Sequence, residues 1–413
     1  TTAYDRLGRK VVSTDQRGVT HRYSFDAAGR LSADSVTSLG AASENVDNSV
    51  LAVVTTYDDM GRTQAITNYD SATARETTDV VNQVKYSYDS WGNVRQSWQA
   101  HSGAVDPYGT ASVQYQYSDG LGAGFGRAAK YVRLTNVIDP ASRSTAYCYD
   151  STAIDDVLSR VSAIIDFNSD EIDYTYLGRG TVVEELNSGY AKLSYLDETG
   201  NVAGLDRFGR IVDQIWTDFG SNEIDRYTYT YDRAGNRTSK VNVKAPDLSE
   251  SYTYDDLNRL TSSNRADNYA QSWTLDGLGN FAAYDNDGDV QTRTANEVNE
   301  ITSTSGIATP TYDAAGNMTS NGTLKYEYDA WNRLVEVRRV SDSSLVANYT
   351  YDGQNHRVTK TLADGTTTDF YYNQMWQMVQ ANTQSGSTTS VYEYVWSVSY
   401  VDAPLVRLHS VAD

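Results

Sequence analysis

The chain has 413 residues, of which 39% are hydrophobic and 21% are charged, and this balance excludes an intrinsically disordered protein. A net charge of −20 at pH 7 argues against a nucleic-acid or anionic-membrane surface, because both partners require basic patches. The single cysteine, Cys148, excludes an intramolecular disulfide and a CxxC metal site, and no apolar run approaches the ~20 residues of a membrane-spanning helix.

A six-residue motif begins at Tyr4 and recurs along the chain. It consists of an aromatic residue or Leu, an Asp, two variable residues, a Gly or Asn, and most often Arg or Asn. The copies are YDRLGR at Tyr4, FDAAGR at Phe25, YDDMGR at Tyr57, YDSWGN at Tyr88, LDRFGR at Leu205, YDDLNR at Tyr254, LDGLGN at Leu275, YDAAGN at Tyr312 and YDAWNR at Tyr328, with looser copies YSDGLG at Tyr117, YDNDGD at Tyr284 and YDGQNH at Tyr351. Repetition of this kind predicts an architecture that grows in one dimension.

The stretch 226–243 (RYTYTYDRAGNRTSKVNV) shows what one motif encodes. Tyr227, Tyr229 and Tyr231 alternate with Thr, which is the period of a β-strand. In the following DRAGN, Asp232 can bond the backbone two residues on and Gly235 accepts a positive φ. The stretch therefore predicts a hairpin closed by a type I turn with a left-handed glycine. In other copies Asn258, Asn332 and Asn355 take the glycine's place, as the tolerance of Asn for this conformation predicts.

The spacing of the motifs divides one continuous repeat region, residues 1–413, into three parts. Residues 1–150 carry regular repeats of about 31 residues, 151–204 carry degenerate repeats, and 205–413 carry shorter repeats. The degenerate turns are YDSTAIDDVLSR, YTYLGRG and YLDETGN, and the stretches 40–49, 71–79 and 381–389 are predicted polar loops. No amphipathic helix is predicted.

The 33 Tyr residues far outnumber the 7 Phe and 7 Trp. Tyr suits a half-buried strand face, because its ring is buried while its hydroxyl stays in water. Pairs of Tyr at positions i and i+2 lie on one sheet face, so stacked repeats predict aromatic ladders across neighbouring strands.

No catalytic, cofactor-binding or metal-binding residue is predicted. His21, His101, His356 and His409 are scattered without a partner at catalytic or metal spacing, which favours strand or loop positions. A carboxylate pair for glycoside hydrolysis can form in space, but no spacing singles one out. The acidic loop Asp285–Asp289 offers oxygen ligands that calcium prefers, whereas its resemblance to the other motifs favours one more acidic turn.

The tryptophans leave two interpretations open. They can form a platform that binds sugars, or they can pack between sheet layers, and packing is the more common role of such residues. They are Trp91, Trp98, Trp216, Trp273, Trp331, Trp376 and Trp396.

The motifs resemble those of the bacterial YD-repeat, or rearrangement-hotspot (Rhs), family over nearly the whole chain. The stretches 204–216 (GLDRFGRIVDQIW) and 252–265 (YTYDDLNRLTSSNR) are close to the family's sequence pattern. The stretch 394–407 resembles the segment that precedes the family's C-terminal core. The resemblance implies a long antiparallel sheet wound into a hollow spiral shell or tube. In the family such shells enclose a C-terminal toxin or belong to large surface proteins, including the teneurins.

Two departures from the family pattern limit the resemblance. The self-cleaving DPxGxxxxxD-type segment is absent, since 106–109 (DPYG) and Asp139-Pro140 lie mid-chain and lack the rest of it. No toxin domain follows Asp413, and the chain starts and stops inside the repeat pattern, so we expect a segment of a longer polypeptide.

The expected function is a non-enzymatic scaffold that forms a wall, tube, fibre or cargo-enclosing cocoon in a secreted or cell-surface protein. The alternative is a cell-surface adhesion module that binds glycans or a protein partner through exposed Tyr and Trp. About fifteen turns imply roughly thirty strands, and at ~4.8 Å spacing these form a sheet about 145 Å long. Twist curls such a sheet, and its two free edges favour pairing with other parts of the polypeptide or with copies of itself.

Overall fold

The computed structural model describes residues 1–41, 45–73, 77–117, 132–149, 154–400 and 402–412. These residues form thirty-five strands, β1 to β35, joined mostly by tight turns, and the predicted all-β fold of antiparallel hairpins is confirmed. The helical segments among them are short, namely α1 (Ile154–Leu158) and 3-10 turns at Thr77–Asp79 and Pro246–Leu248. None of the helices in these ranges is long and apolar enough to cross a bilayer.

The chain forms two compact units. Unit 1 comprises Thr1–Ser118, Leu134–Ser144 and Pro310–Asp413, and unit 2 comprises Asp119–Arg133 and Thr145–Thr309.

Unit 1 contains two antiparallel sheets. The N-terminal sheet orders its strands along the chain, with β5 set aside: β1 (Thr2–Tyr4), β2 (Lys10–Thr14), β3 (Val19–Phe25), β4 (Leu31–Leu39), β6 (Ala52–Tyr57), β7 (Thr63–Tyr69), β8 (Val80–Tyr88), β9 (Val94–Ala100), β10 (Ser112–Tyr117) and β11 (Leu134–Ile138). The C-terminal sheet contains β26 (Thr311–Tyr312), β27 (Met318–Ser320), β28 (Leu324–Asp329), β29 (Leu334–Arg339), β30 (Leu345–Tyr351), β31 (Arg357–Leu362), β32 (Thr367–Tyr372), β33 (Met378–Ser385), β34 (Thr388–Trp396) and β35 (Pro404–Ala412).

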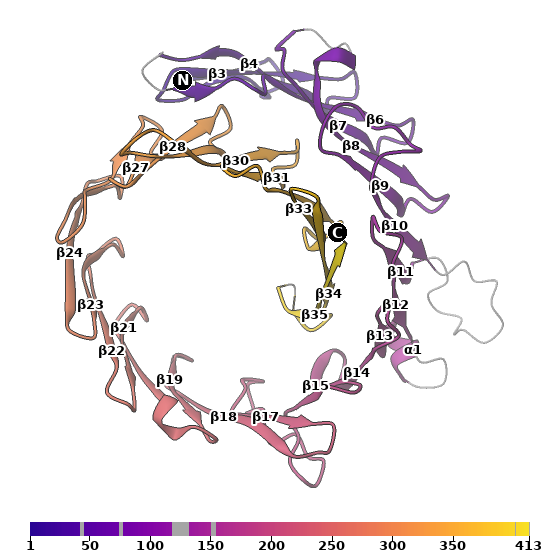
Figure 1. Cartoon of the computed structure of the whole chain (residues 1–413). Helices are drawn as coiled ribbons and strands as arrows, with labels where there is room; N and C mark the ends of the chain where they lie inside the picture. The colour runs from indigo at the N-terminus through magenta and orange to yellow at the C-terminus, as the bar shows by residue number, and fades with distance from the viewer. Residues whose placement is uncertain (42–44, 74–76, 118–131, 150–153, 401, 413) are drawn as a thin grey trace. The chain divides into compact units, whose positions relative to one another are not determined.

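The two sheets of unit 1 lie against one another, and Figure 1 shows strands β28 to β33 running alongside β3 to β9. The short strand β5 (Val46–Asp47), inside a predicted loop, pairs in parallel with β28. Near this point Val19 and Val36 of the N-terminal sheet pack with Ala330 of the C-terminal sheet, and Leu39, Val46, Leu51 and Trp331 surround them. The core of unit 1 therefore lies between two layers that are some 300 residues apart in sequence.

Unit 2 is a meander in which each strand pairs with the next along the chain. Its strands are β12 (Ser144–Cys148), β13 (Ala163–Ile165), β14 (Glu171–Leu177), β15 (Thr181–Asn187), β16 (Ala191–Ser194), β17 (Asp213–Asp218), β18 (Glu223–Tyr231), β19 (Arg237–Asn242), β20 (Glu250–Tyr254), β21 (Leu260–Arg265), β22 (Ala270–Leu275), β23 (Phe281–Asn286), β24 (Asp289–Ala295) and β25 (Ile301–Thr304).

The turn at Asp232 has the predicted geometry. The Gly235 N–H donates to the Asp232 carbonyl (3.3 Å), the Asp232 N–H donates to the Asn236 carbonyl (2.9 Å), and φ of Gly235 is +95°. The Asp232 carboxylate accepts the Asn236 backbone N–H and side-chain amide at 2.8 and 2.9 Å. The ladder also shifts register at Tyr231, so the hairpin closes with a type I turn and a bulge at a left-handed residue.

The left-handed position accepts more residue types than predicted. Asn258, Asn332 and Asn355 have φ between 61° and 71°, which confirms their assignment. Ser142, Ser169, Ser221 and Trp376 occupy the same position in turns whose sequences do not follow the six-residue motif. Those turns start at Asp139, Asp166, Asp218 and Asn373, and further unrecognised turns start at Asp15 and Asn296.

Five local expectations turned out differently or lie outside the described residues. YLDETGN is a regular turn, since Asp197 accepts the Asn201 N–H like the other motif aspartates. The copy at Tyr284 is instead a two-residue hairpin at Asp287-Gly288, both with positive φ. The predicted loop 381–389 is paired strand in β33 and β34 apart from a two-residue turn at 386–387, because Thr and Ser suit an exposed strand face. The turn of YSDGLG at Tyr117 and residues 150–153 of YDSTAIDDVLSR lie outside the described residues, and the rest of the latter includes the unexpected helix α1.

Candidate functional site

Buried side-chain amides of the N-terminal sheet hold the backbone of turns in the C-terminal sheet. Asn68 on β7 and Asn82 on β8 both donate to the Tyr351 carbonyl, at 2.9 and 2.8 Å. Gln99 on β9 bonds Tyr372 twice, since its Nε2 donates to the carbonyl (2.8 Å) and its Oε1 accepts the N–H (3.0 Å). Tyr351 and Tyr372 each come directly before a turn, so the amides hold two successive hairpins. We call these contacts between the two sheets of unit 1 the seam.

His21 and Asp34 hold a second part of the seam. The His21 Nδ1 lies 2.7 Å from Asp34 Oδ1, and its Nε2 lies 3.1 Å from the Ala330 carbonyl across the layers. The Trp331 indole N–H donates to the other Asp34 oxygen (2.9 Å). Burial lowers the pKa of His21, but the hydrogen bond to Asp34 and its charge outweigh burial and raise that pKa overall. Both ring nitrogens face acceptors, so only the protonated imidazole donates to both.

A third part of the seam carries buried charge. The Ala141 N–H donates to Gln380 Oε1 (3.1 Å), and Arg143 forms an ion pair with Glu393. Burial raises the pKa of Glu393 to about 7, with Asp139 adding to the rise and Arg143 opposing it. Burial likewise raises the pKa of Asp139.

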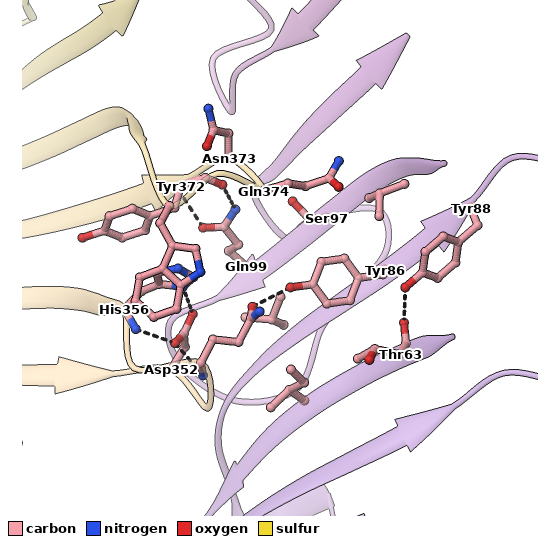
Figure 2. Close-up of a pocket in the computed structure, with 15 residues that line it drawn as sticks. Thr63, Tyr86, Tyr88, Ser97, Gln99, Asp352, His356, Tyr372, Asn373 and Gln374 are labelled. Carbon is pink, nitrogen blue, oxygen red and sulfur yellow. Dashed lines mark hydrogen bonds and ion pairs between the residues drawn. The ribbon is translucent and has the colours of Figure 1, made fainter. Parts of the chain in front are cut away.

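A cavity of about 240 Å³ opens along the seam. Figure 2 shows Tyr86, Tyr88 and Gln99 reaching it from the N-terminal sheet, and Asp352 and His356 from a turn of the C-terminal sheet. The lining residues are Thr63, Ile66, Val84, Tyr86, Tyr88, Val94, Ser97, Gln99, Asp352, Gln354, His356, Tyr372, Asn373, Gln374 and Trp376.

Three of the four histidines that the sequence left scattered meet the seam. His21 bridges the layers, His356 lines the cavity, and His101 lies 3.3 Å from Asp369 with its ring stacked 4.6 Å from Tyr371. His409 stacks on Tyr392 within one sheet, at 4.4 Å. The seam partners of His21 and His101 lie well over 250 residues away, so no spacing signalled them.

Most of the tryptophans pack or donate inside the sheets. Trp331 joins the core between the layers, Trp273 stacks on Tyr284, and the indoles of Trp98 and Trp396 donate to backbone carbonyls. Trp216 is half-buried in β17. Only Trp91 and Trp376 are mostly exposed among these seven.

Two residues of the acidic loop Asp285–Asp289 use side-chain oxygens in hydrogen bonds within the sheet. Asn286 Oδ1 accepts from Tyr269, Gln271 and Tyr284, and Asp285 Oδ1 accepts the Gly288 N–H (2.7 Å). Within the described ranges no three His, Cys, Asp or Glu side chains gather as a metal site would require. The assignment of this loop as a turn without calcium stays a prediction.

A large apolar side chain stands exposed on many turns, two residues after the turn's Asp or Asn. These side chains are 64–80% exposed, and they are Leu7, Met60, Trp91, Phe208, Leu257, Leu278 and Val298. Trp331 holds the same place in its turn, but it packs beside Val19 and Val36 of the other sheet. In this turn the side chain is therefore covered by the second layer.

Comparison with known proteins finds similar sequences and similar folds. Residues 204–395 match the sequence model of the Teneurin YD-shell. The chain is 28% identical over 145 residues to the tRNA nuclease WapA of Bacillus subtilis strain 168 and to the tRNA3(Ser)-specific nuclease WapA of Bacillus spizizenii. These matches span 34% of this chain and 6% of either relative.

Solved shells share the fold at low sequence identity. The structure of the Photorhabdus luminescens Tc holotoxin pore matches 96% of this chain with a TM-score of 0.70 and 14% identity. The crystal structure of TcdB2-TccC3-TEV matches 100% of this chain with a TM-score of 0.69 and 13% identity. The chain spans 21% and 22% of the length of those chains. Together with a dozen copies of the turn motif, these matches support a YD-repeat shell of the Rhs type.

Proposed function

We propose that this chain is a wall segment of a longer YD-repeat shell, in a large secreted or cell-surface protein that encloses a polypeptide cargo. The seam is the observation that carries the proposal. The side-chain amide of Asn68 is completely buried, and it donates to a backbone carbonyl beside a turn some 280 residues later in the chain. When strands late in the chain bond strands early in the chain in this way, the two sheets form the layers of a wall.

The exposed turn residues support continuation of this wall. An apolar side chain such as Phe208 or Met60 costs free energy in water, at about 25 cal/mol per Å² of apolar surface. The seam shows how such a residue is covered, because Trp331 packs on the N-terminal sheet. A further layer of the same kind of sheet covers the remaining ones in the same way.

The scaffold role also fits how the repeat uses its carboxylates. At Asp58 one oxygen accepts two backbone N–H groups of the turn, and the other accepts the Arg62 guanidinium. Catalytic carboxylates need oxygens that reach a substrate. We therefore assign no catalytic role to the motif aspartates, and we place any toxin or nuclease activity in other parts of the polypeptide.

Limited proteolysis of the full polypeptide that carries this chain tests the proposal. We expect a long segment to resist protease in the native protein and to become sensitive in Gln99→Ala, which loses both bonds to Tyr372. Gln96→Ala is the matched control, because Gln96 lies on the same strand but bonds Ser112 within its own sheet (2.9 Å). Equal digestion of all segments in the native protein would overturn the proposal.

The adhesion module is the second candidate, and exposed aromatic side chains favour it. Tyr108, Trp91 and Phe219 are each more than 60% exposed. Aromatic residues are enriched where proteins bind partners. Binding of the chain to intact cells or to an immobilised glycan, lost when Trp91 is replaced by Ala, would favour this candidate over the wall.

A further inference from the structure

Two neighbouring turns carry unusual residues at positions where most repeats share a pattern. The residue four after the turn's Asp is usually Arg or Asn, and its side chain donates to the Asp carboxylate, as in Arg333 to Asp329. In the turn after β30 this residue is His356, and in the turn after β32 it is Gln377. The latter turn also places Trp376 at φ +64°, where the other motif turns have Gly, Asn or Ser.

Trp376 is the more unusual departure. A bulky side chain in the left-handed region strains the backbone, and strain of this kind persists mainly at functional sites. A packing role does not account for it, because the side chain is 58% exposed. The turn after β30 contains Gly353, and packing explains that residue. A Cβ at this position would lie 2.4 Å from the Ile66 side chain.

The two departures meet in the cavity at the seam. The His356 ring stacks on Tyr372 with centroids 4.7 Å apart. The Trp376 ring lies edge-on to the His356 ring, with centroids 4.2 Å apart. Both residues line the cavity, together with Tyr86 and Tyr88 from the N-terminal sheet. Figure 2 shows His356 beside Asp352 on one side of the cavity and Tyr86 on the other.

His356 presents one acceptor atom. Its Nδ1 lies 2.8 Å from Asp352 Oδ2, so in the neutral ring Nδ1 carries the proton and Nε2 accepts. The side chain is 8% exposed, and Nε2 has no hydrogen-bond partner among the described residues. A buried nitrogen of this kind gains from an O–H or N–H donor on a ligand.

The lining disfavours an anionic ligand. It contains neither Lys nor Arg, so it offers nothing to pair with a phosphate or carboxylate. Its one carboxylate, Asp352, already accepts the N–H groups of Gln354 and His356, both at 2.9 Å. What remains are amides, hydroxyls and aromatic rings, and at about 240 Å³ the space suits one ring of a ligand.

We propose that this cavity binds one neutral sugar ring of a glycan. His356 Nε2 accepts a hydrogen bond from a sugar hydroxyl, Trp376 stacks on the apolar face of the sugar, and the amides of Gln354 and Gln374 bond further hydroxyls. This site is independent of the wall function, and failure of either proposal leaves the other intact.

Two variants that restore the repeat's own residues make the test selective. Trp376→Gly removes the stacking ring and places the preferred residue in the left-handed position, so Tm is expected to stay the same or rise. His356→Arg restores the usual Asp–Arg pair and removes the acceptor. An array of neutral and acidic glycans probes the unmodified chain, and calorimetry then measures Kd for the strongest ligand.

We expect a neutral glycan to bind and each variant to weaken it by about tenfold or more. Leu257→Ala is the control, since it removes an exposed apolar side chain from a different turn, and it should leave Kd unchanged. Failure of every neutral glycan to bind at millimolar concentration would overturn the proposal. Unchanged Kd in both variants, or a large fall in Tm of Trp376→Gly, would also overturn it, the last by showing a packing role.

Discussion

The guanidinium of Arg30 lies 4.1 Å from the ring centroid of Tyr57, so the last residue of one turn motif covers the first residue of the next. The Tyr57 hydroxyl donates to the carbonyl of Leu31, directly after Arg30, at 2.8 Å. Arg62 with Tyr88 and Arg210 with Tyr231 repeat the arrangement. Motifs that begin with such a Tyr are thereby bonded to their predecessors, which helps to explain why Tyr outnumbers Phe.

Replacing Tyr57 by Phe isolates the hydroxyl. The ring and its contact with Arg30 remain, while the hydrogen bond to Leu31 is lost, so stability should fall by about 0.5–1.5 kcal/mol. Tyr4→Phe is the control, because Tyr4 is 64% exposed at the first strand, and it should change little. Urea unfolding of the two variants checks this, and equal midpoints would contradict the role of the hydroxyl.

Gly235 should tolerate Asn far better than Val. Its φ of +95° is open to Gly and tolerated by Asn, whereas a β-branched side chain there costs about 1–3 kcal/mol. Thermal unfolding of Gly235→Val and Gly235→Asn makes the comparison. Equal losses for the two variants would show that the backbone conformation of this turn is not what limits the residue.

The seam should be strongest in mild acid. The raised pKa of His21 means that its stabilisation is complete below about 6.5 and is lost as pH rises through the higher folded value. Glu393, with its pKa raised to about 7, likewise favours the folded seam below about 4.5 and loses that contribution as pH rises toward 7. Both groups therefore predict weakening between pH 5 and 8.

Proteolytic opening of unit 1 as a function of pH measures this effect. His21→Gln and Glu393→Gln should each flatten the profile, because neither replacement titrates in that range. An opening rate that falls as the pH of the unmodified chain rises from 5 to 8 would contradict this account of the seam.

Asn68 and Asn82 should be coupled. Both donate to the Tyr351 carbonyl, so either single replacement by Ala leaves that carbonyl one partner. Replacing both leaves it buried without a donor, at a cost of about 1–3 kcal/mol beyond the sum of the single variants. A double-mutant cycle in urea measures the difference, and additive losses would show that the two amides act independently.

The sequence predicted what depends on residues close together along the chain. The alternating Tyr and Thr of 226–231, the Asp232 turn and its left-handed Gly235 all follow from local rules, and the structure has them. The loop 381–389 was wrong for a local reason, because Ser, Thr and Gly occur both in loops and on exposed strand faces.

The seam had no local signal. Nothing in the residues around Gln99 indicates that its side chain bonds Tyr372. The hydrogen bond between His21 and Asp34 is local, but it does not indicate the contact of His21 with the other sheet. The one signal available was departure from the repeat itself. His356 stands where most other copies of the motif have Arg or Asn. Trp376 occupies the position that is most often Gly, in a turn that departs from the motif because it begins with Asn373 instead of Asp.

Electron microscopy of the isolated chain tests the central claim that it is a segment of a layered wall. We predict an open structure in which the two sheets of unit 1 stack through the seam, with free strand edges that are exposed or joined to another copy. A compact monomer that seals its own cavity, or an extended sheet whose N- and C-terminal strands do not meet, would contradict it.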